Sequence, residues 1–165
     1  MENCAQARQQ LLSYSILALM IFSLSALSGC GHGIFTSCVV EGSLVSVPLA
    51  KARPIEDFRV GDKVVSLNSD GELSSSVIRA RKVGTASSYL RIAITDQEED
   101  LQVTAVHPVW SSGKWVEAGS LKVGDSVRTL KGVAMIVSIE EEEAQTRVHD
   151  LSVFPDENFF ANGVL

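Results

Sequence analysis

The pattern of apolar and polar residues after position 37 is typical of β-strands. Leu90, Ile92 and Ile94 alternate with smaller or polar residues, which is the two-residue period of a strand. Val133–Ile139 is apolar at nearly every position, and this predicts a strand that is buried on both faces. No long segment keeps the 3.6-residue period of a helix, so the sequence predicts an all-β fold. Two further strands are predicted from their β-branched residues, over Ser76–Val83 and Arg147–Phe154.

Turn signals separate the predicted strands. Asn68–Gly71 and Asn162–Gly163 carry Asn and Gly, the residues that hairpin turns favour. Glu140–Glu143 is a run of four carboxylates, which we interpret as a solvated hairpin loop. One helical turn is predicted over Arg53–Phe58, with Pro54 at its first position.

A short phrase occurs twice in the sequence. Phe58–Leu67 and Leu121–Leu130 both contain Val-Gly-Asp, with apolar residues at matching positions on either side. Glycine permits the backbone angles of a tight turn, and aspartate can accept hydrogen bonds from nearby backbone N–H groups. The repeat predicts two similar β subdomains that are related by a pseudo-two-fold axis.

The N-terminal segment has a different character. Leu11–Leu27 is apolar and uncharged, and it is slightly short for a membrane span of about 20 residues. It leads into Leu-Ser-Gly-Cys, which resembles the lipobox of bacterial lipoproteins; the resemblance implies cleavage before Cys30 and a lipid on that cysteine. An uncleaved anchor is the alternative. We expect a signal peptide over residues 1–29, a lipidated tether over residues 30–37 and a folded domain over residues 38–165, held at the bacterial cell envelope and facing away from the cytoplasm.

Composition narrows the possible functions. Fourteen Lys and Arg against twenty Asp and Glu give a net charge of -6, which argues against binding to nucleic acid. Three cysteines are too few for a disulfide scaffold, and neither a metal-ligand spacing of His and Cys nor a phosphate-binding loop is present. We expect a monomer without cofactor or metal. Cleavage before Cys30 would leave Cys38 as the only free thiol, either a reactive nucleophile or a small buried apolar residue.

Several short motifs follow one another in a recognisable order. Cys38 opens Cys-Val-Val-Glu-Gly-Ser, and Thr104–Pro108 is Thr-Ala-Val-His-Pro. Near the end come Val148–Val153, which is Val-His-Asp-Leu-Ser-Val, and Asn158–Gly163, which is Asn-Phe-Phe-Ala-Asn-Gly. Together with the paired Val-Gly-Asp turns, this order resembles the Hint family of autoprocessing domains, which includes inteins, hedgehog C-terminal regions and bacterial Hint modules. The resemblance covers residues 38–165 and implies a compact β disc.

The resemblance also implies a reaction. Cys38 would attack the carbonyl of Ser37 and convert the peptide bond to a thioester by an N-to-S acyl shift. His107 would protonate the departing nitrogen, Thr104 would orient the amide or donate to the oxyanion, and Asp150 would activate the thiol or a second nucleophile. The substrate would be the chain's own N-terminal peptide, and the acceptor would be water or a small nucleophile.

Two departures from splicing relatives limit that reaction. Such relatives end in His-Asn before a nucleophile, whereas this chain ends in Val164-Leu165; they often carry a His where this chain has Glu157. We therefore expect N-terminal self-cleavage without splicing. The alternative is a degenerate, non-catalytic Hint module that acts as a membrane-anchored binding or structural domain. His149 and Trp115 are interpreted as packing residues.

Overall fold

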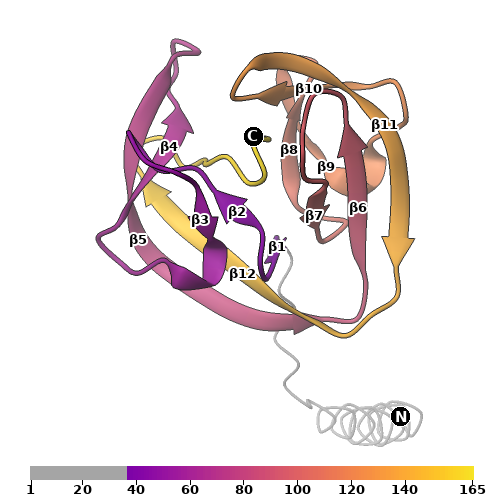
Figure 1. The fold of residues 1–165 in the computed structure, drawn as a ribbon, viewed down its shortest axis with the longest axis horizontal. Helices are drawn as coiled ribbons and strands as arrows, with labels where there is room; N and C mark the ends of the chain where they lie inside the picture. The colour runs from indigo at the N-terminus through magenta and orange to yellow at the C-terminus, as the bar shows by residue number, and fades with distance from the viewer. Residues whose placement is uncertain (1–36) are drawn as a thin grey trace, which may run out of the picture. The chain divides into compact units, whose positions relative to one another are not determined.

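The computed structural model describes residues 37–165 (Figure 1). The predictions for the signal peptide, for Cys30 and for most of the tether therefore lie outside the described residues. Within the described range the secondary structure consists of β-strands and two short 3-10 helices, so the predicted all-β class is confirmed. No helix in residues 37–165 is long and apolar enough to cross a membrane.

Twelve strands are present in the described part of the chain. The first six are β1 (Val39–Val40), β2 (Leu44–Val45), β3 (Arg53–Pro54), β4 (Lys63–Leu67), β5 (Leu73–Ala86) and β6 (Tyr89–Ile94). The others are β7 (Leu101–Val103), β8 (Pro108–Ser111), β9 (Lys114–Glu117), β10 (Ser126–Thr129), β11 (Gly132–Glu142) and β12 (Thr146–Phe154). The 3-10 helices are η1 (Ile55–Asp57) and η2 (Ala118–Ser120).

Eight strands are arranged symmetrically about one pairing, with β4-β5-β12-β1 on one side of it and β7-β6-β11-β10 on the other. Ten strands follow the order β4-β5-β12-β1-β7-β6-β11-β10-β8-β9, and β2 pairs with β3 in a separate ribbon. The sequence of elements β2-β3-η1-β4-β5 recurs as β8-β9-η2-β10-β11. The centre is the antiparallel pairing of β1 with β7, where Val39 lies opposite Val103. The predicted pair of related halves is therefore confirmed.

The two halves exchange strands. β6 follows β5 along the chain but pairs with β11, and β12 follows β11 but pairs with β5. The two ribbons cross near the lower edge of Figure 1, where the long strands pass from one half to the other. Each half therefore contains one strand that the other half of the sequence supplies, and neither half is complete alone.

The repeated Val-Gly-Asp segments occupy equivalent turns. Gly61 has φ +95 and Gly124 has φ +90, in the region that favours glycine. The Gly61 N–H donates to the carbonyl of Ile78, and the Gly124 N–H donates to the carbonyl of Ile136, both at 2.9 Å. Each turn is thus hydrogen-bonded to the second strand of the hairpin that it begins: the first turn to β5 and the second to β11.

The aspartates of the two turns also act alike. Asp62 Oδ2 accepts the Arg59 N–H at 3.0 Å, and Asp125 Oδ2 accepts the Lys122 N–H at 2.9 Å. Asp62 additionally forms an ion pair with Arg53, and these donors lower the pKa of its carboxyl. The pseudo-two-fold relation therefore extends from the strand order to individual side chains.

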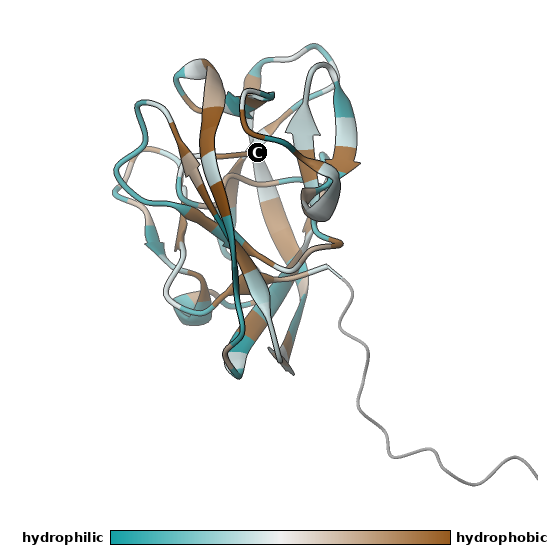
Figure 2. Cartoon of the chain, turned by 90° about the vertical axis from the view of Figure 1, so that its right-hand side faces the viewer, coloured by the Kyte–Doolittle hydropathy of each residue, from teal (hydrophilic) through white to brown (hydrophobic). Residues whose placement is uncertain are grey.

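Most of the predicted strands are confirmed, but the burial of β11 differs from expectation. Leu90, Ile92 and Ile94 face the core from β6, as their alternation predicts. On β11, Ala134 and Ile136 are buried while Val133, Met135 and Val137 are exposed. The prediction of burial on both faces was wrong because, among the described residues, no second layer covers the outer face of this strand. In Figure 2, many hydrophobic residues (brown) lie along the strands, and hydrophilic residues (teal) are frequent in the loops.

Two smaller predictions are corrected. Pro54 ends β3 and precedes η1, so the helical turn is shorter than Arg53–Phe58. Glu140–Glu142 belongs to β11 and pairs with β6 rather than forming a loop, because strand pairing occupies only the backbone and leaves the carboxylates at the surface. The Asn68–Gly71 and Asn162–Gly163 turns are confirmed, and the latter has positive φ at both residues.

The two equivalent glycines generate a stability prediction. Gly61→Ala and Gly124→Ala should each lower the free energy of unfolding by about 1 kcal/mol or more, since a Cβ is strained at positive φ. Val60→Ala is the control, because this exposed side chain lies in the same turn and should change stability little. Urea denaturation measures all three. A neutral result for either glycine would contradict the conformational role assigned to that turn.

Candidate active site

The centre of the symmetric strand order holds Cys38 and Thr104 together. Cys38 immediately precedes β1 and Thr104 immediately follows β7, so the pairing of these strands brings the two residues side by side. The Cys38 N–H donates to Thr104 Oγ1 at 3.1 Å, and the Thr104 N–H donates to the Cys38 carbonyl at 3.0 Å. The threonine hydroxyl therefore contacts the nitrogen of the Ser37–Cys38 peptide bond.

The Cys38 thiol is buried in a small apolar cluster. Cys38 is 2% exposed and packs with Val40 and Val148. Burial, and after it the nearby Asp150 carboxylate, raise the pKa of the thiol to about 11, against the smaller opposing effects of Lys82 and a hydrogen bond from the Ser37 backbone. The resting group at neutral pH is therefore the thiol, and nucleophilic attack requires a base to remove its proton.

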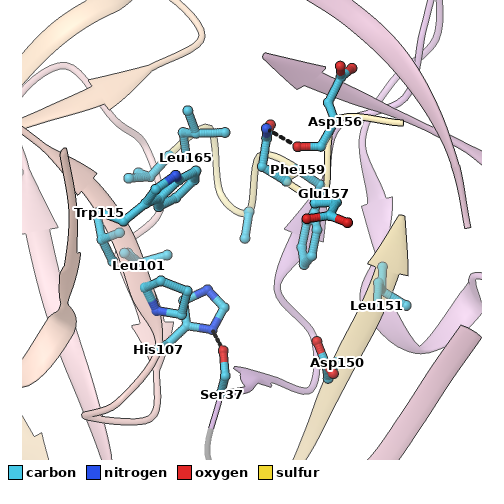
Figure 3. A pocket seen from close by; sticks show the side chains of 15 residues that line it. Ser37, Leu101, His107, Trp115, Asp150, Leu151, Asp156, Glu157, Phe159 and Leu165 are labelled. Carbon is cyan, nitrogen blue, oxygen red and sulfur yellow. Dashed lines mark hydrogen bonds between the residues drawn. The ribbon is translucent and has the colours of Figure 1, made fainter. Parts of the chain in front are cut away.

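His107 is positioned by the backbone on both sides. Its N–H donates to the Thr104 carbonyl at 2.9 Å, and its own carbonyl accepts the Ala118 N–H at 2.8 Å. The ring Nδ1 lies 3.3 Å from Ser37 Oγ, as the dashed line in Figure 3 marks. Burial lowers the pKa of His107 to about 4, so the imidazole is neutral at pH 7.

One expected contact differs from the structure. The sequence argument assigns His107 to the backbone nitrogen of Cys38, but the hydrogen-bond acceptor at this nitrogen is Thr104 Oγ1. His107 instead contacts the side chain on the other side of the same peptide bond. The difference arises because β7 ends directly opposite Cys38, whereas His107 lies in the turn beyond it.

Asp150 and His149 are neighbours on β12 with different surroundings. Asp150 lines the pocket, and burial raises the pKa of its carboxyl. His149 is fully buried opposite Val39, with Nε2 3.6 Å from Glu41 Oε1, and burial lowers its pKa. The alternation of a strand thus sends these two side chains to different environments, which agrees with the interpretation of His149 as a packing residue.

A pocket of about 360 Å³ adjoins Ser37. Ser37, His107 and Asp150 line one part of it in Figure 3, and Trp115 and Glu157 line other parts. Trp115 is 45% exposed and packs edge-on against Trp110, so it forms the rim of the pocket as well as a packing contact. The sequence argument identified Glu157 only as a departure from splicing relatives and assigned it no role at the site, and it did not find the Ser37 side chain, which no motif marks.

The described residues offer no metal centre. No group of three or more His, Cys, Asp or Glu side chains within residues 37–165 is arranged to hold a metal ion.

The symmetric β fold, with a buried cysteine at its centre, defines a Hint-type domain. Residues 48–164 match the family described as the pretoxin HINT domain, and the chain belongs to this family. A search of curated proteins finds no match.

Solved structures of inteins and intein-like domains share the fold. A bacterial intein-like domain from Clostridium thermocellum is 24% identical, with a TM-score of 0.71 over 78% of this chain and 96% of that one. A DnaB intein from Synechocystis is 20% identical, with a TM-score of 0.70 over 77% and 94%. The TvoVMA intein is 22% identical, with a TM-score of 0.69 over 79% and 96%. At these identities the likeness establishes the fold alone.

The lowered pKa of His107 predicts a pH dependence. Because the imidazole is harder to protonate in the folded state, the unfolded state binds more protons between pH 6.5 and about 4. The free energy of unfolding should therefore fall as pH falls through this window, by at most about 3 kcal/mol and by less to the extent that the ring keeps partial solvent exposure.

Two measurements check this pH dependence. NMR titration of a Cys38→Ala precursor should give a His107 midpoint near 4. His107→Gln should flatten the dependence of stability on pH, leaving the contribution of His149, whose pKa is also lowered. A midpoint near the ordinary histidine value of about 6.5 would contradict the burial argument.

Proposed function

We propose that this autoprocessing-type domain cleaves its own chain between Ser37 and Cys38 through a thioester. The observation that carries the proposal is the hydrogen bond between the Cys38 N–H and Thr104 Oγ1 at 3.1 Å, at the nitrogen that must leave. The contact of His107 Nδ1 with Ser37 supports it, because the two groups lie on either side of one peptide bond.

The first step is attack by sulfur. Asp150 takes the proton from the Cys38 thiol; its raised pKa makes it a stronger base than an ordinary carboxylate, and the transfer removes the negative charge that opposes thiolate formation. The sulfur then adds to the Ser37 carbonyl carbon and forms a tetrahedral intermediate. His107 holds the Ser37 side chain during this attack.

The second step is departure of nitrogen. The C–N bond breaks, a C–S bond remains, and the nitrogen of Cys38 gains the proton that the thiol lost. Thr104 Oγ1 is in hydrogen-bond contact with this nitrogen. His107, whose imidazole is neutral at rest, relays the thiol proton from Asp150 to the nitrogen. Water or a small nucleophile then breaks the thioester and releases the segment that ends at Ser37.

We further propose that splicing does not occur. Cyclisation of asparagine needs a free side-chain amide, and the Asn162 side chain is bonded at both ends. Its Oδ1 accepts the Leu44 N–H at 2.6 Å, and its Nδ2 donates to the Asp100 carbonyl at 2.7 Å. These bonds give Asn162 a structural role in the closing turn.

A precursor with an extended N-terminal tag tests the cleavage reaction. Dithiothreitol or hydroxylamine should cut wild type only between Ser37 and Cys38, and Cys38→Ala should remain intact. His107→Ala should slow cleavage by about 10²–10⁴-fold. Thr104→Ala should lower the cleavage rate by about 10²–10³-fold, while Thr104→Ser should retain most of the rate because it keeps the hydroxyl. Intact-protein mass spectrometry measures each product.

A folded wild type that stays whole under both reagents would favour a second function, that of a non-catalytic module. The 2% exposure of Cys38 and its raised pKa are the observations that favour this alternative. Equal cleavage of wild type and Cys38→Ala would also contradict the proposal, because the scission would then owe nothing to the thiol.

We also propose that the domain is anchored at the bacterial cell envelope by a lipid on Cys30. The support is the sequence Leu-Ser-Gly-Cys after the apolar run Leu11–Leu27. Cys30→Ala should abolish labelling by a fatty-acid analogue in a bacterial host and leave an unprocessed precursor. Unchanged labelling, or labelling of Cys4 instead, would favour an uncleaved anchor.

A further inference from the structure

The segment after β12 fixes one carboxylate at the pocket. Asp156, just before Glu157, accepts hydrogen bonds from the hydroxyls of Ser66 at 2.7 Å, of Ser76 at 3.1 Å and of Ser74. These hydroxyls lower the pKa of Asp156 and satisfy its charge. Asp156 is therefore an anchor to the β4–β5 hairpin.

Asn158 anchors the other side of Glu157. Its Oδ1 accepts the Leu67 N–H at 2.8 Å, and its Nδ2 donates to the Leu67 carbonyl at 2.9 Å. Between these two anchors Glu157 has φ +56, a conformation that non-glycine residues seldom adopt. The backbone on both sides therefore sets the direction in which the Glu157 side chain leaves the chain.

The Glu157 carboxylate faces the pocket and has no partner there. In Figure 3 it lies across the cavity from Ser37 and His107. Among residues 37–165, no hydrogen bond or ion pair occupies this carboxylate, whereas Oδ2 of the neighbouring Asp156 accepts three hydroxyls. An exposed carboxylate without a partner at the pocket is available to a ligand.

The rest of the pocket suits an alkyl chain with a positive charge. Its charged lining residues are Asp150, Asp156 and Glu157, all acidic, and no Lys or Arg is among the residues that line it. Leu101 and Trp115 contribute to an apolar wall. The volume of about 360 Å³ far exceeds what one attacking water needs, since a water occupies about 30 Å³. An indole face also attracts cations.

We propose that this pocket binds the acceptor of the Ser37 acyl group, and that the acceptor is a primary alkylamine whose ammonium group Glu157 recognises. The inference rests on the proposed thioester chemistry and names the substrate class of the same site. The lysine side chain of another polypeptide and a free aliphatic amine share this chemistry, and a Nα-acetyl-lysine probe with its carboxyl blocked as an amide, beside a simple amine, separates the two sources.

The transfer step balances as follows in atoms and protons. Glu157 attracts the ammonium into the pocket, and the amine forms when the ammonium gives one proton to solvent. The amine nitrogen attacks the thioester carbonyl of Ser37, the C–N bond forms, and the C–S bond breaks. Cys38 leaves as a thiolate, and the surplus proton on the new amide nitrogen passes to the thiolate.

A pair of matched probes tests the assignment. The tagged precursor is incubated with n-butylamine or with 4-aminobutanoate, which has a similar chain and an added negative charge. Rates are corrected for the fraction of free amine. We expect n-butylamine to react at least tenfold faster and to saturate with concentration, and the Nα-acetyl-lysine product to form if a lysine side chain fits the pocket.

Variants connect the preference to Glu157. Glu157→Gln should reduce the n-butylamine rate at least tenfold while dithiothreitol cleavage stays within twofold, which also shows that the variant is folded. Glu157→Lys should reverse the preference between the two probes. Glu143→Gln is the matched control, because this exposed carboxylate follows β11 and does not line the pocket.

The outcomes separate this inference from the proposed function. If dithiothreitol releases nothing from wild type, the thioester proposal itself fails. If dithiothreitol cleaves but the two probes react equally, or if Glu157→Gln leaves the n-butylamine rate unchanged, the recognition of an amine acceptor by Glu157 is overturned.

Discussion

The short pairing of β1 with β7 is the interaction on which the candidate site depends. It joins the two related halves of the domain at one register, Val39 opposite Val103. One residue beyond each partner, on the same side, lie Cys38 and Thr104, whose backbone and hydroxyl groups bond to each other. A shift of this register by one residue would reverse the faces of the side chains and remove the threonine hydroxyl from the peptide nitrogen. The same strand pairing therefore sets both the symmetry of the fold and the geometry of the site.

Strand exchange supplies the third group of the site. Asp150 lies on β12, which comes from the end of the chain yet pairs with both β5 and β1 in the first half. Without that exchange the carboxylate would belong to the other half of the domain. The same crossing buries His149 beside Val39, so a packing residue and a candidate base reach the centre on one strand. The interlocked halves bring together three distant segments of sequence, residues 37–38, 104–107 and 150, around one pocket.

Local sequence could predict those features that depend on local physics. The alternation around Ile92 predicts β6, and the Val-Gly-Asp repeat predicts the two-fold because the glycine conformation and the aspartate bonds recur in each copy. Exposure of Met135 could not be predicted, since it depends on which layer covers β11. The partner of His107 depends on where Ser37 lies, and the direction of Glu157 depends on anchors in a distant hairpin. These features depend on tertiary contacts, and the local sequence carries no signal for them.

The electrostatics of the resting site explain why orientation matters more than charge. Burial keeps the Cys38 thiol protonated and the His107 imidazole neutral, so the resting site has no thiolate–imidazolium pair. In the proposed cleavage, the nucleophile must therefore form at the moment of attack, by transfer of a proton to a neighbouring group such as Asp150. Such a transfer is efficient only when the groups are already aligned. The hydrogen bonds around Ser37 and Thr104 supply that alignment, and their loss should slow the reaction even where the thiol remains intact.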